Sequence, residues 1–347
     1  MASFIAHIAQ LSDEEKSDLF CLLYDANKRV RRRFAPKSDY SVTNTLIQLY
    51  HPESVAIDSD GSIVVADRHK HQIRRIESDG QVSTLAGSGS KGWKNGAAHE
   101  AEFQYPWGVA IDNDGSIVVA DWGNHQIRRI ESDGQVSTLA GSGSKGFKDG
   151  AAHEAKLNFP SGVAINSDGS IVVADSFNHR IRRIEADGPV ITLAGSGSKG
   201  FKDGAAHEAQ FDLPSGVAIN SDGSIVVADS FNHRIRQIKA NGQVSTLAGS
   251  GSKGFKDGAA HEAQFFGPTG VAVGSDGSIV VADTCNHRIR QIKADGWVST
   301  LAGSGSKGFK DGAAHEVQFT YPAGVAIGRD GCIVVADKEN HRIRRIE

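Results

Sequence analysis

The chain has 347 residues, of which 40 are glycine, 8 are proline and 3 are cysteine, and its formal net charge is −3. With 23% charged and 39% hydrophobic residues, it is neither disordered nor membrane-spanning as a whole. The near-neutral charge gives no general attraction to polyanions, and the odd, unpaired cysteines predict no disulfide framework, as expected in a reducing compartment.

Residues 1–40 predict a short α-helical extension. Ser12 and Glu15 have the spacing of a capping box, and an apolar stripe at helical spacing follows, formed by Leu19, Leu22, Leu23, Ala26 and Val30. The sequence does not choose between packing of this stripe on the rest of the chain and dimerisation. The basic run at 28–33 is typical of a helix C-terminus, with nuclear targeting or phosphate contact as the alternative. We see no secretory signal and no membrane span, and we expect a cytoplasmic protein, with the nucleus as the alternative.

Beyond this extension, two strings recur every 54 residues. The string VVAD occurs six times, ending at Asp67, Asp121, Asp175, Asp229, Asp283 and Asp337. The string LAGSGSKG occurs five times, beginning at Leu85, Leu139, Leu193, Leu247 and Leu301. A repeat of this length predicts stacked or ring-forming units.

One unit predicts four strands, at about 216–220, 224–229, 233–239 and 243–249. Asx-Gly pairs separate the first strand from the second and the third from the fourth, and such pairs are strong hairpin signals. The run Ile-Val-Val-Ala in the second strand is apolar on both faces, so both faces are expected to be covered. A repeated four-stranded sheet covered on both sides is typical of a propeller blade.

The termini predict that the ring is closed. The chain ends in the third strand of the sixth unit, and residues 44–46 match a fourth strand, but no long connector precedes Pro52. We therefore expect the segment near 41–48 to pair beside the C-terminal strand, which removes free sheet edges. The predicted fold is all-β: a six-bladed β-propeller of four-stranded antiparallel blades over residues 41–347, closed by an N-terminal strand, behind the helical extension over residues 1–40.

The run Val-Ala-Asp-Ser-Phe-Asn-His-Arg-Ile-Arg at 173–182, preceded by Pro-Ser-Gly-Val-Ala-Ile at 160–165, resembles the NHL repeat. Here arginine or glutamine replaces the final leucine of the Asn-His-Leu signature, and the first copy departs further, with Lys70-His71-Gln72. The resemblance covers residues 41–347 and implies a six-bladed propeller. It leaves function open, because the family includes ubiquitin-ligase subunits, RNA-binding repressors, scaffolds and secreted lyases.

Several repeated features suggest metal, phosphate or nucleic-acid binding, but each is more typical of a structural role. The six histidines that follow the VVAD strings suggest metal ligands, yet six equal copies around a ring do not converge on one ion, so we expect Asp-Asn-His hydrogen-bond clusters that fix the turns. The Asp-x-Asp-Gly strings resemble calcium loops but lack the glutamate at position twelve. The Gly- and Lys-rich connectors lack a phosphate-binding motif. Arginine pairs on the third strands suggest a basic rim, but the near-neutral net charge makes nucleic-acid binding a minority interpretation.

A binding surface is expected where the copies differ. Strand direction places the turns between second and third strands, and the long connectors, on one face of the ring, which we call face A. The residues flanking each proline and those in the turns vary there, and aromatic and arginine side chains are typical binding anchors. The predicted partner-binding residues are Tyr105, Trp107, Trp122, Phe177, Phe231, Arg68, Lys338 and Glu339.

We favour a non-enzymatic interaction module, a scaffold that binds protein partners through face A. One alternative is a propeller hydrolase or lyase with a metal in the central channel, which the nearly uniform first strands disfavour. The other is an RNA-binding NHL propeller. No catalytic residue, cofactor or metal ligand is predicted, and no zinc-finger cysteines precede the ring to indicate a ubiquitin ligase.

Overall fold

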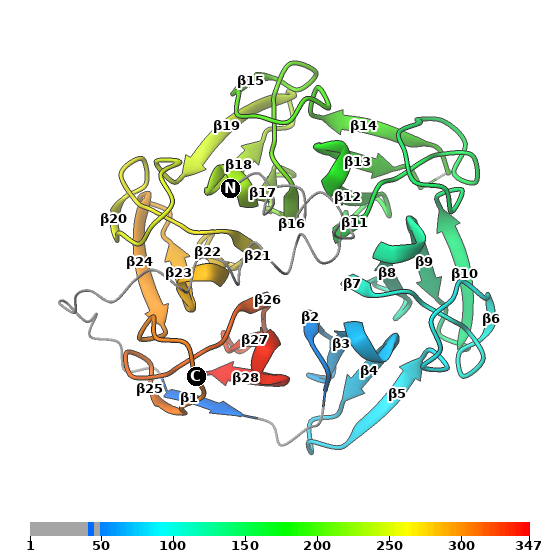
Figure 1. Cartoon of the computed structure of the whole chain (residues 1–347), viewed down its shortest axis with the longest axis horizontal. Coiled ribbons are helices and arrows are strands. Elements are labelled where there is room, and N and C mark those ends of the chain that lie inside the picture. Colours follow the sequence, from blue (N-terminus) through cyan, green and yellow to red (C-terminus); the bar gives the residue numbers. More distant parts are fainter. Residues whose placement is uncertain (1–40, 45–48, 187) are drawn as a thin grey trace, which may run out of the picture. The chain divides into compact units, whose positions relative to one another are not determined.

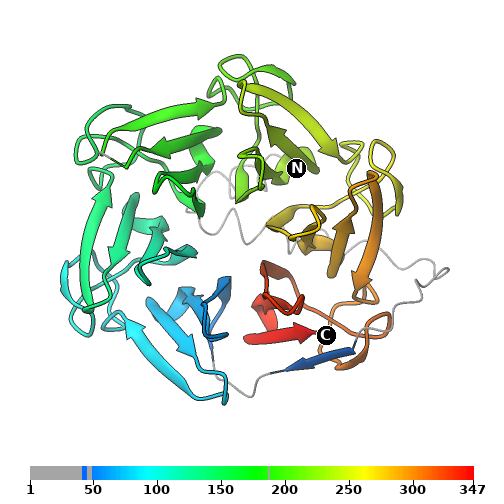
Figure 2. The ribbon, with the colours of Figure 1, turned by 180° about the vertical axis from the view of Figure 1, so that it is seen from behind.

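The computed structural model describes residues 41–44, 49–186 and 188–347. The predicted helical extension over 1–40 lies outside the described residues. The described chain forms six antiparallel sheets arranged as blades of a ring (Figure 1), and Figure 2 shows the ring from behind. Each first strand is innermost, and the later strands follow outward to the rim.

Each blade contains four main strands. Blade 1 comprises β2 (Pro52–Ile57), β3 (Ile63–Asp67), β4 (Gln72–Ile76) and β5 (Val82–Ala86). Blade 2 comprises β7 (Pro106–Ile111), β8 (Ile117–Asp121), β9 (Gln126–Ile130) and β10 (Gln135–Ala140). Blade 3 comprises β11 (Pro160–Ile165), β12 (Ile171–Asp175), β13 (Arg180–Ile184) and β14 (Val190–Ala194).

The second half of the ring repeats this order. Blade 4 comprises β16 (Pro214–Ile219), β17 (Ile225–Asp229), β18 (Arg234–Ile238) and β19 (Gln243–Ala248). Blade 5 comprises β21 (Pro268–Val273), β22 (Ile279–Asp283), β23 (Arg288–Ile292) and β24 (Trp297–Ala302). Blade 6 comprises β26 (Pro322–Ile327), β27 (Ile333–Asp337), β28 (Arg342–Ile346) and, as its fourth strand, β1 (Ser41–Asn44).

Short 3-10 turns join the second and third strands: η2 (Arg68–Lys70), η3 (Trp122–Asn124), η4 (Ser176–Asn178), η5 (Ser230–Asn232), η6 (Thr284–Asn286) and η7 (Lys338–Asn340). The long connectors add a short fifth strand to four blades: β6 (Gly96–Ala97), β15 (Gly204–Ala205), β20 (Gly258–Ala259) and β25 (Gly312–Ala313). This fifth strand is absent from the sequence prediction. No described helix is long and apolar enough to cross a membrane.

The ring closes as the sequence predicts. β1 pairs antiparallel with the C-terminal β28, with Val42 opposite Ile346 and Thr43 opposite Arg345. Val42 is 1% exposed and belongs to the hydrophobic core between blades 5 and 6. The first and last described strands therefore share one sheet, and this pairing covers the outer edge of β28.

The cores lie between adjacent blades, because side chains of the second strand alternate between its two faces. In blade 3, Val172 and Ala174 face the core shared with blade 4, whereas Ile171 and Val173 face the core shared with blade 2. One large side chain from the chain segment before each blade completes its core. These anchors are Leu49, Phe103, Leu157, Phe211, Phe265 and Phe319.

Glycine allows the innermost strands to approach one another at the centre of the ring. A Cβ atom on Gly162 would lie 2.3 Å from the backbone oxygen of Ser215 in the next blade. Three other blades have glycine at this position with equally close contacts, blade 6 has Gly324 with a closest contact of 2.6 Å, and blade 1 has Ser54. The inner strands therefore pack backbone against backbone and leave a narrow channel.

Candidate functional site

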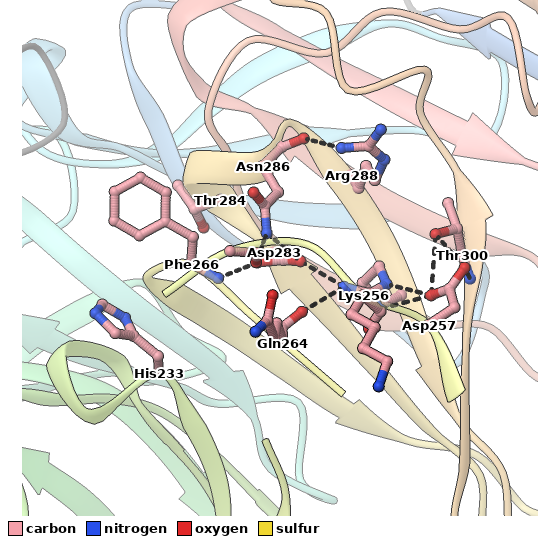
Figure 3. Close-up of polar contacts among 12 residues, drawn as sticks. His233, Lys256, Asp257, Gln264, Phe266, Asp283, Thr284, Asn286, Arg288 and Thr300 are labelled. Atoms are coloured by element: carbon pink, nitrogen blue, oxygen red, sulfur yellow. Dashed lines mark hydrogen bonds and ion pairs between the residues drawn. The ribbon is translucent and has the colours of Figure 1, made fainter. Parts of the chain in front are cut away.

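A buried carboxylate lies at the end of every second strand. In blade 3, Asp175 Oδ2 accepts hydrogen bonds from Arg182 Nη1 at 2.7 Å and from Asn178 Nδ2 at 2.8 Å. The same bonds recur in blades 2, 4, 5 and 6, and Figure 3 shows the asparagine bond of blade 5, between Asp283 and Asn286. Burial raises the pKa of Asp121 and Asp229 to about 6, against the opposing effect of their arginines.

The arginines of these clusters do not form a basic rim. The first arginine of the third-strand pair is fully buried in five blades: Arg128, Arg182, Arg236, Arg290 and Arg344. The neighbouring arginine, where present, forms ion pairs with hairpin acids, as Arg129 does with Asp114 at 2.7 Å. This arrangement removes the support that the arginine pairs gave to the nucleic-acid interpretation.

The six repeat histidines link neighbouring blades. The predicted Asp-Asn part of the turn cluster is confirmed, but the histidine points elsewhere: His179 Nδ1 accepts a hydrogen bond from the backbone N–H of Leu213, in the next blade, at 3.2 Å. His341 closes the cycle by accepting from the N–H of His51 at 3.2 Å. Nδ1 must be unprotonated to accept, and burial lowers the pKa of His71, His179 and His233.

The variable residues of face A are matched within blades. In blades 1, 2, 3 and 5, the residue after the proline contacts the first residue of the 3-10 turn in the same blade. In blade 3 the Ser161 and Ser176 hydroxyls lie 2.6 Å apart, and Ser176 donates to the Pro214 carbonyl of the next blade at 2.6 Å. Thr269 and Thr284 repeat both features in blade 5. These hydroxyls join blades and are buried or nearly so.

Blades 6, 1 and 2 replace these hydroxyls with charged and aromatic side chains. Glu53 pairs with Arg68 at 3.2 Å in blade 1, and Lys338 of blade 6 reaches the same carboxylate at 2.9 Å. In blade 2, Trp107 stacks on Trp122 with ring centroids 5.7 Å apart. A charged pair and an aromatic pair thus stand where blades 3 and 5 have hydroxyl pairs.

Cations lie close to the ring of Trp107. The Arg68 guanidinium is 4.9 Å and the Lys338 ammonium 5.8 Å from the Trp107 ring centroid, within cation–π range. Arg68 is fully buried and Trp122 is 3% exposed, so they support the surface from below. Trp107 is half-buried at the mouth of the channel, where it lines a cavity.

The other predicted residues divide between this cluster and a separate position. Tyr105 and Glu339 are half-buried beside it, and Phe177 reaches it through Phe159, at a ring distance of 4.9 Å. Phe231 lies in blade 4, where Lys199 is 5.9 Å from its ring centroid. The structure therefore brings seven of the eight predicted residues onto blades 6 and 1 to 3.

One exposed aromatic residue is missing from the predicted set. Tyr50 is 46% exposed, and its ring lies 5.2 to 5.3 Å from His51, His69 and His341. His51 and His69 stack with centroids 4.3 Å apart. The sequence could have indicated Tyr50, because the position two residues before the proline also varies among the blades. We call Tyr50, His51, Glu53, Arg68, His69, Tyr105, Trp107, Trp122, Lys338 and Glu339 the aromatic–cationic sector.

The central channel offers little space on this side. Its cavity of about 40 Å³ is lined by Glu53, Ser54, Trp107 and mainly glycines of the first strands. That is room for roughly three water molecules, whereas small-molecule pockets measure roughly 300–1,000 Å³. Among the described residues, no group of three or more His, Cys, Asp or Glu side chains is arranged to hold a metal ion.

The fold defines a six-bladed β-propeller, and the repeated Asp-x-x-Asn-His turns are its signature. The NHL-repeat family model matches residues 49–76, 103–130, 157–184, 211–238, 265–292 and 319–346, one match per blade. The chain belongs to the NHL-repeat family.

Two curated proteins are similar to the chain over most of its length. The Arabidopsis thaliana protein SUPPRESSOR OF QUENCHING 1, chloroplastic, is 30% identical over 86% of this chain and 30% of its own length. Human NHL repeat-containing protein 2 is 31% identical over 85% of this chain and 46% of its own length. The chain thus spans less than half the length of these relatives.

Solved structures share the fold at low identity. A Bacteroides thetaiotaomicron protein of unknown function has a TM-score of 0.68 at 18% identity, covering 89% of this chain and 76% of that one. A streptogramin B lyase has a TM-score of 0.55 at 14% identity, covering 89% and 97%. At these identities the likeness extends to the fold alone.

Proposed function

We propose that this propeller is a non-enzymatic scaffold that binds protein partners through the aromatic–cationic sector of face A. The observation that carries the proposal is the break in repeat symmetry. Blades 3 and 5 use hydroxyl pairs to join neighbouring blades, whereas the sector presents Tyr50, Tyr105 and Trp107 over buried charges. Nothing in the ring closure itself requires tryptophan at this position.

The chemistry of the sector suits a protein surface. Aromatic side chains held rigidly near the centre of a patch are the commonest binding hot spots. Trp107 is fixed by Trp122 below it and by the cations beside it, so little side-chain entropy is lost on binding. Glu53 neutralises part of the charge of Arg68 and Lys338, which favours a partner that offers apolar or aromatic side chains over a polyanion.

The experiment replaces the aromatic pair with the pair of a neighbouring blade. Trp107→Ser with Trp122→Ser gives blade 2 the residues that blade 3 carries at 161 and 176, so the fold has a working template. The control is Trp297→Gln, which removes a 51% exposed tryptophan from the outer strand β24 and installs the glutamine found at that position in other blades.

We expect affinity capture from a cytoplasmic extract to recover the same partners with wild type and with Trp297→Gln, and to lose them with the double serine variant. A fluorescent fusion is expected in the cytoplasm. Equal recovery by all three proteins, with the double variant folded by circular dichroism, would refute binding through this sector.

A further inference from the structure

Blade 1 has an outer edge that no described residue pairs with. In blades 2 and 4 to 6, a Gly-Ala segment of the preceding connector pairs with the outermost strand, as β6 does with β10 and β20 with β24. In blade 3 a single bridge, Gly150 to Val190, does the same. Blade 1 has no long connector before it, and its sheet ends at β5 (Figure 1).

The filled edge follows one pattern, which Figure 3 shows for blade 5. Asp257 of the connector accepts hydrogen bonds from Arg290 Nε at 3.0 Å and from Thr300 Oγ1 at 3.0 Å. The backbone carbonyls of Lys256 and Gln264 accept from the same guanidinium at 2.9 and 3.1 Å. The same connector therefore accepts hydrogen bonds from a buried arginine and pairs with the outer edge of the blade's last strand.

Blade 1 has the arginine and the threonine of this pattern but lacks the connector that bonds to them. Arg74 stands opposite Thr84, as Arg290 stands opposite Thr300. The Arg74 side chain is 18% exposed, against 0% for its five counterparts. Its Nη1 lies 3.6 Å from Asp67 Oδ2, too far for a hydrogen bond, and Nε donates instead to the Ser83 carbonyl at 3.2 Å.

The strand edge is open in the same place. In blade 3, the N–H and C=O of Val190 exchange hydrogen bonds with Gly150 at 2.8 and 2.9 Å, and Val190 is fully buried. The equivalent Val82 is half-buried and Thr84 is exposed, and among the described residues no strand pairs with their outer side. Within the described part of the chain, buried Asp67 Oδ2 has no hydrogen-bond partner, whereas the corresponding oxygen in the other blades accepts two.

We propose that the outer edge of blade 1 is a docking site for an extended segment of a partner protein that contains Asp-Gly followed by a small residue. The aspartate takes the place of Asp257 and bonds to Arg74 and Thr84. Glycine follows because the backbone there has φ of 122 to 137° in the five connectors, a region that favours glycine. The segment adds a strand to β5, a known mode of peptide recognition.

The occupant is a partner because the connectors of this chain are already engaged. Each of the five pairs with its own blade, so a second copy would have to open one of its blades to supply the segment. The site lies on the rim, away from the aromatic–cationic sector, and it stands or falls independently of the scaffold function proposed above.

The test uses a peptide copied from the chain, residues 254–265, GFKDGAAHEAQF. Titration of the ¹⁵N-labelled peptide with the full-length protein, followed by NMR, is expected to show saturable binding. Alanine at the peptide position of Asp257 and, separately, Arg74→Gln in the protein should each weaken binding at least tenfold. Arg75→Gln is the matched control, because Gln237 and Gln291 occupy this position in blades 4 and 5, and it should bind as wild type does.

A second protein variant fills the site from within. Insertion of a copy of residues 248–262 between residues 46 and 47 restores the connector spacing of the other blades, and it should abolish peptide binding and raise the melting temperature. No saturable binding, or binding that neither Arg74→Gln nor the insertion reduces, would overturn the proposal.

Hydrogen exchange distinguishes other occupants of the edge. In the isolated full-length chain, the amide of Val82 should exchange much faster than those of Val190, Val244 and Val298. Slow exchange at Val82 would instead assign the edge to this chain's own residues 1–40 or 45–48, and slow exchange that is lost on dilution would assign it to a second copy.

Discussion

In five of the six blades, a buried third-strand arginine pairs with the buried aspartate that ends the second strand. Each pair is fully desolvated, and further donors of each guanidinium bond to connector carbonyls, as Arg236, paired with Asp229, does with the Gln210 carbonyl. Removing one partner of such a pair leaves an uncompensated charge, which is costly in a protein interior.

Arg236→Met is therefore expected to destabilise the fold by about 3–5 kcal/mol. Arg74→Met, at the same position in blade 1, should cost roughly 1 kcal/mol or less, because its side chain is 18% exposed and its nearest carboxylate contact is 3.6 Å. Urea unfolding of both variants measures the difference. Equal losses would contradict the view that the connector makes these arginines structural.

The inter-blade histidines predict a pH dependence. His233 accepts from the N–H of Gly267, and burial lowers its pKa from 6.5. The unfolded chain therefore takes up this proton at higher pH than the folded chain, and the histidine's contribution is present above pH 6.5 and lost as the pH falls. Burial raises the pKa of Asp229 to about 6, so the folded chain holds this proton more tightly than the unfolded chain does. The contribution of Asp229 to stability therefore falls as the pH rises toward 6, opposite to that of the histidine.

Comparison of wild type with His233→Asn isolates the histidine, because the aspartates are common to both. Asparagine tolerates the φ of 54° at this position. We expect the free energy of unfolding to fall less between pH 7.5 and 5.5 in the variant than in wild type. His261→Asn, which removes an exposed connector histidine, should follow the wild-type curve. Parallel curves for His233→Asn and wild type would disprove the prediction.

At the scale of the element, the first strand is shaped by its neighbours. Gly162→Ala would place a methyl group 2.3 Å from the backbone oxygen of Ser215, which neither strand can avoid without moving the ring. We expect a loss of about 1–3 kcal/mol from overpacking. Ser54→Ala at the equivalent position of blade 1 creates no such clash, and it should cost about 1 kcal/mol or less, from the hydrogen bond that Ser54 Oγ accepts from the Val109 N–H at 3.3 Å. Thermal unfolding compares the two, and a neutral Gly162→Ala would show that the inner strands are not tightly packed.

The hairpins show which elements a local pattern determines. Asx-Gly turns and the apolar Ile-Val-Val-Ala run predict the strands of each blade, and the structure confirms them. The short fifth strands were not predicted, because Gly-Ala has low strand propensity. These two residues form a strand only because the outermost strand of a blade lies beside them. The connectors are architectural, as predicted, but their first aromatic residues are not buried: Phe147 is 45% exposed and stacks under Arg180 at 3.7 Å.

At the scale of the whole molecule, one short strand closes the ring. β1 covers β28 and contributes Val42 to a core, and burying one such side chain is worth roughly 1.5–3 kcal/mol. A chain that begins at residue 45 should therefore melt at a lower temperature than a chain that begins at residue 41, and it should associate through the open edge of β28. Calorimetry and sedimentation test this, and equal melting with a monomeric shorter chain would contradict closure by β1.

The sequence by itself determined the number of blades, the strands within each and the closure of the ring, because a 54-residue period, hairpin turns and apolar alternation are local properties. It also found most of the variable residues on face A, since strand direction alone places them there. It did not separate Trp107, which is half-buried at the surface, from Arg68 and Trp122, which lie beneath it.

Only the tertiary structure decided the roles of the repeated polar residues. Arg182 is indistinguishable in sequence from its half-buried neighbour Arg183, yet it is fully buried because a connector from 33 residues earlier encloses it. His179 has its partner in the next blade, 34 residues away. Such contacts depend on how blades and connectors meet around the ring, and no pattern within one repeat contains that information.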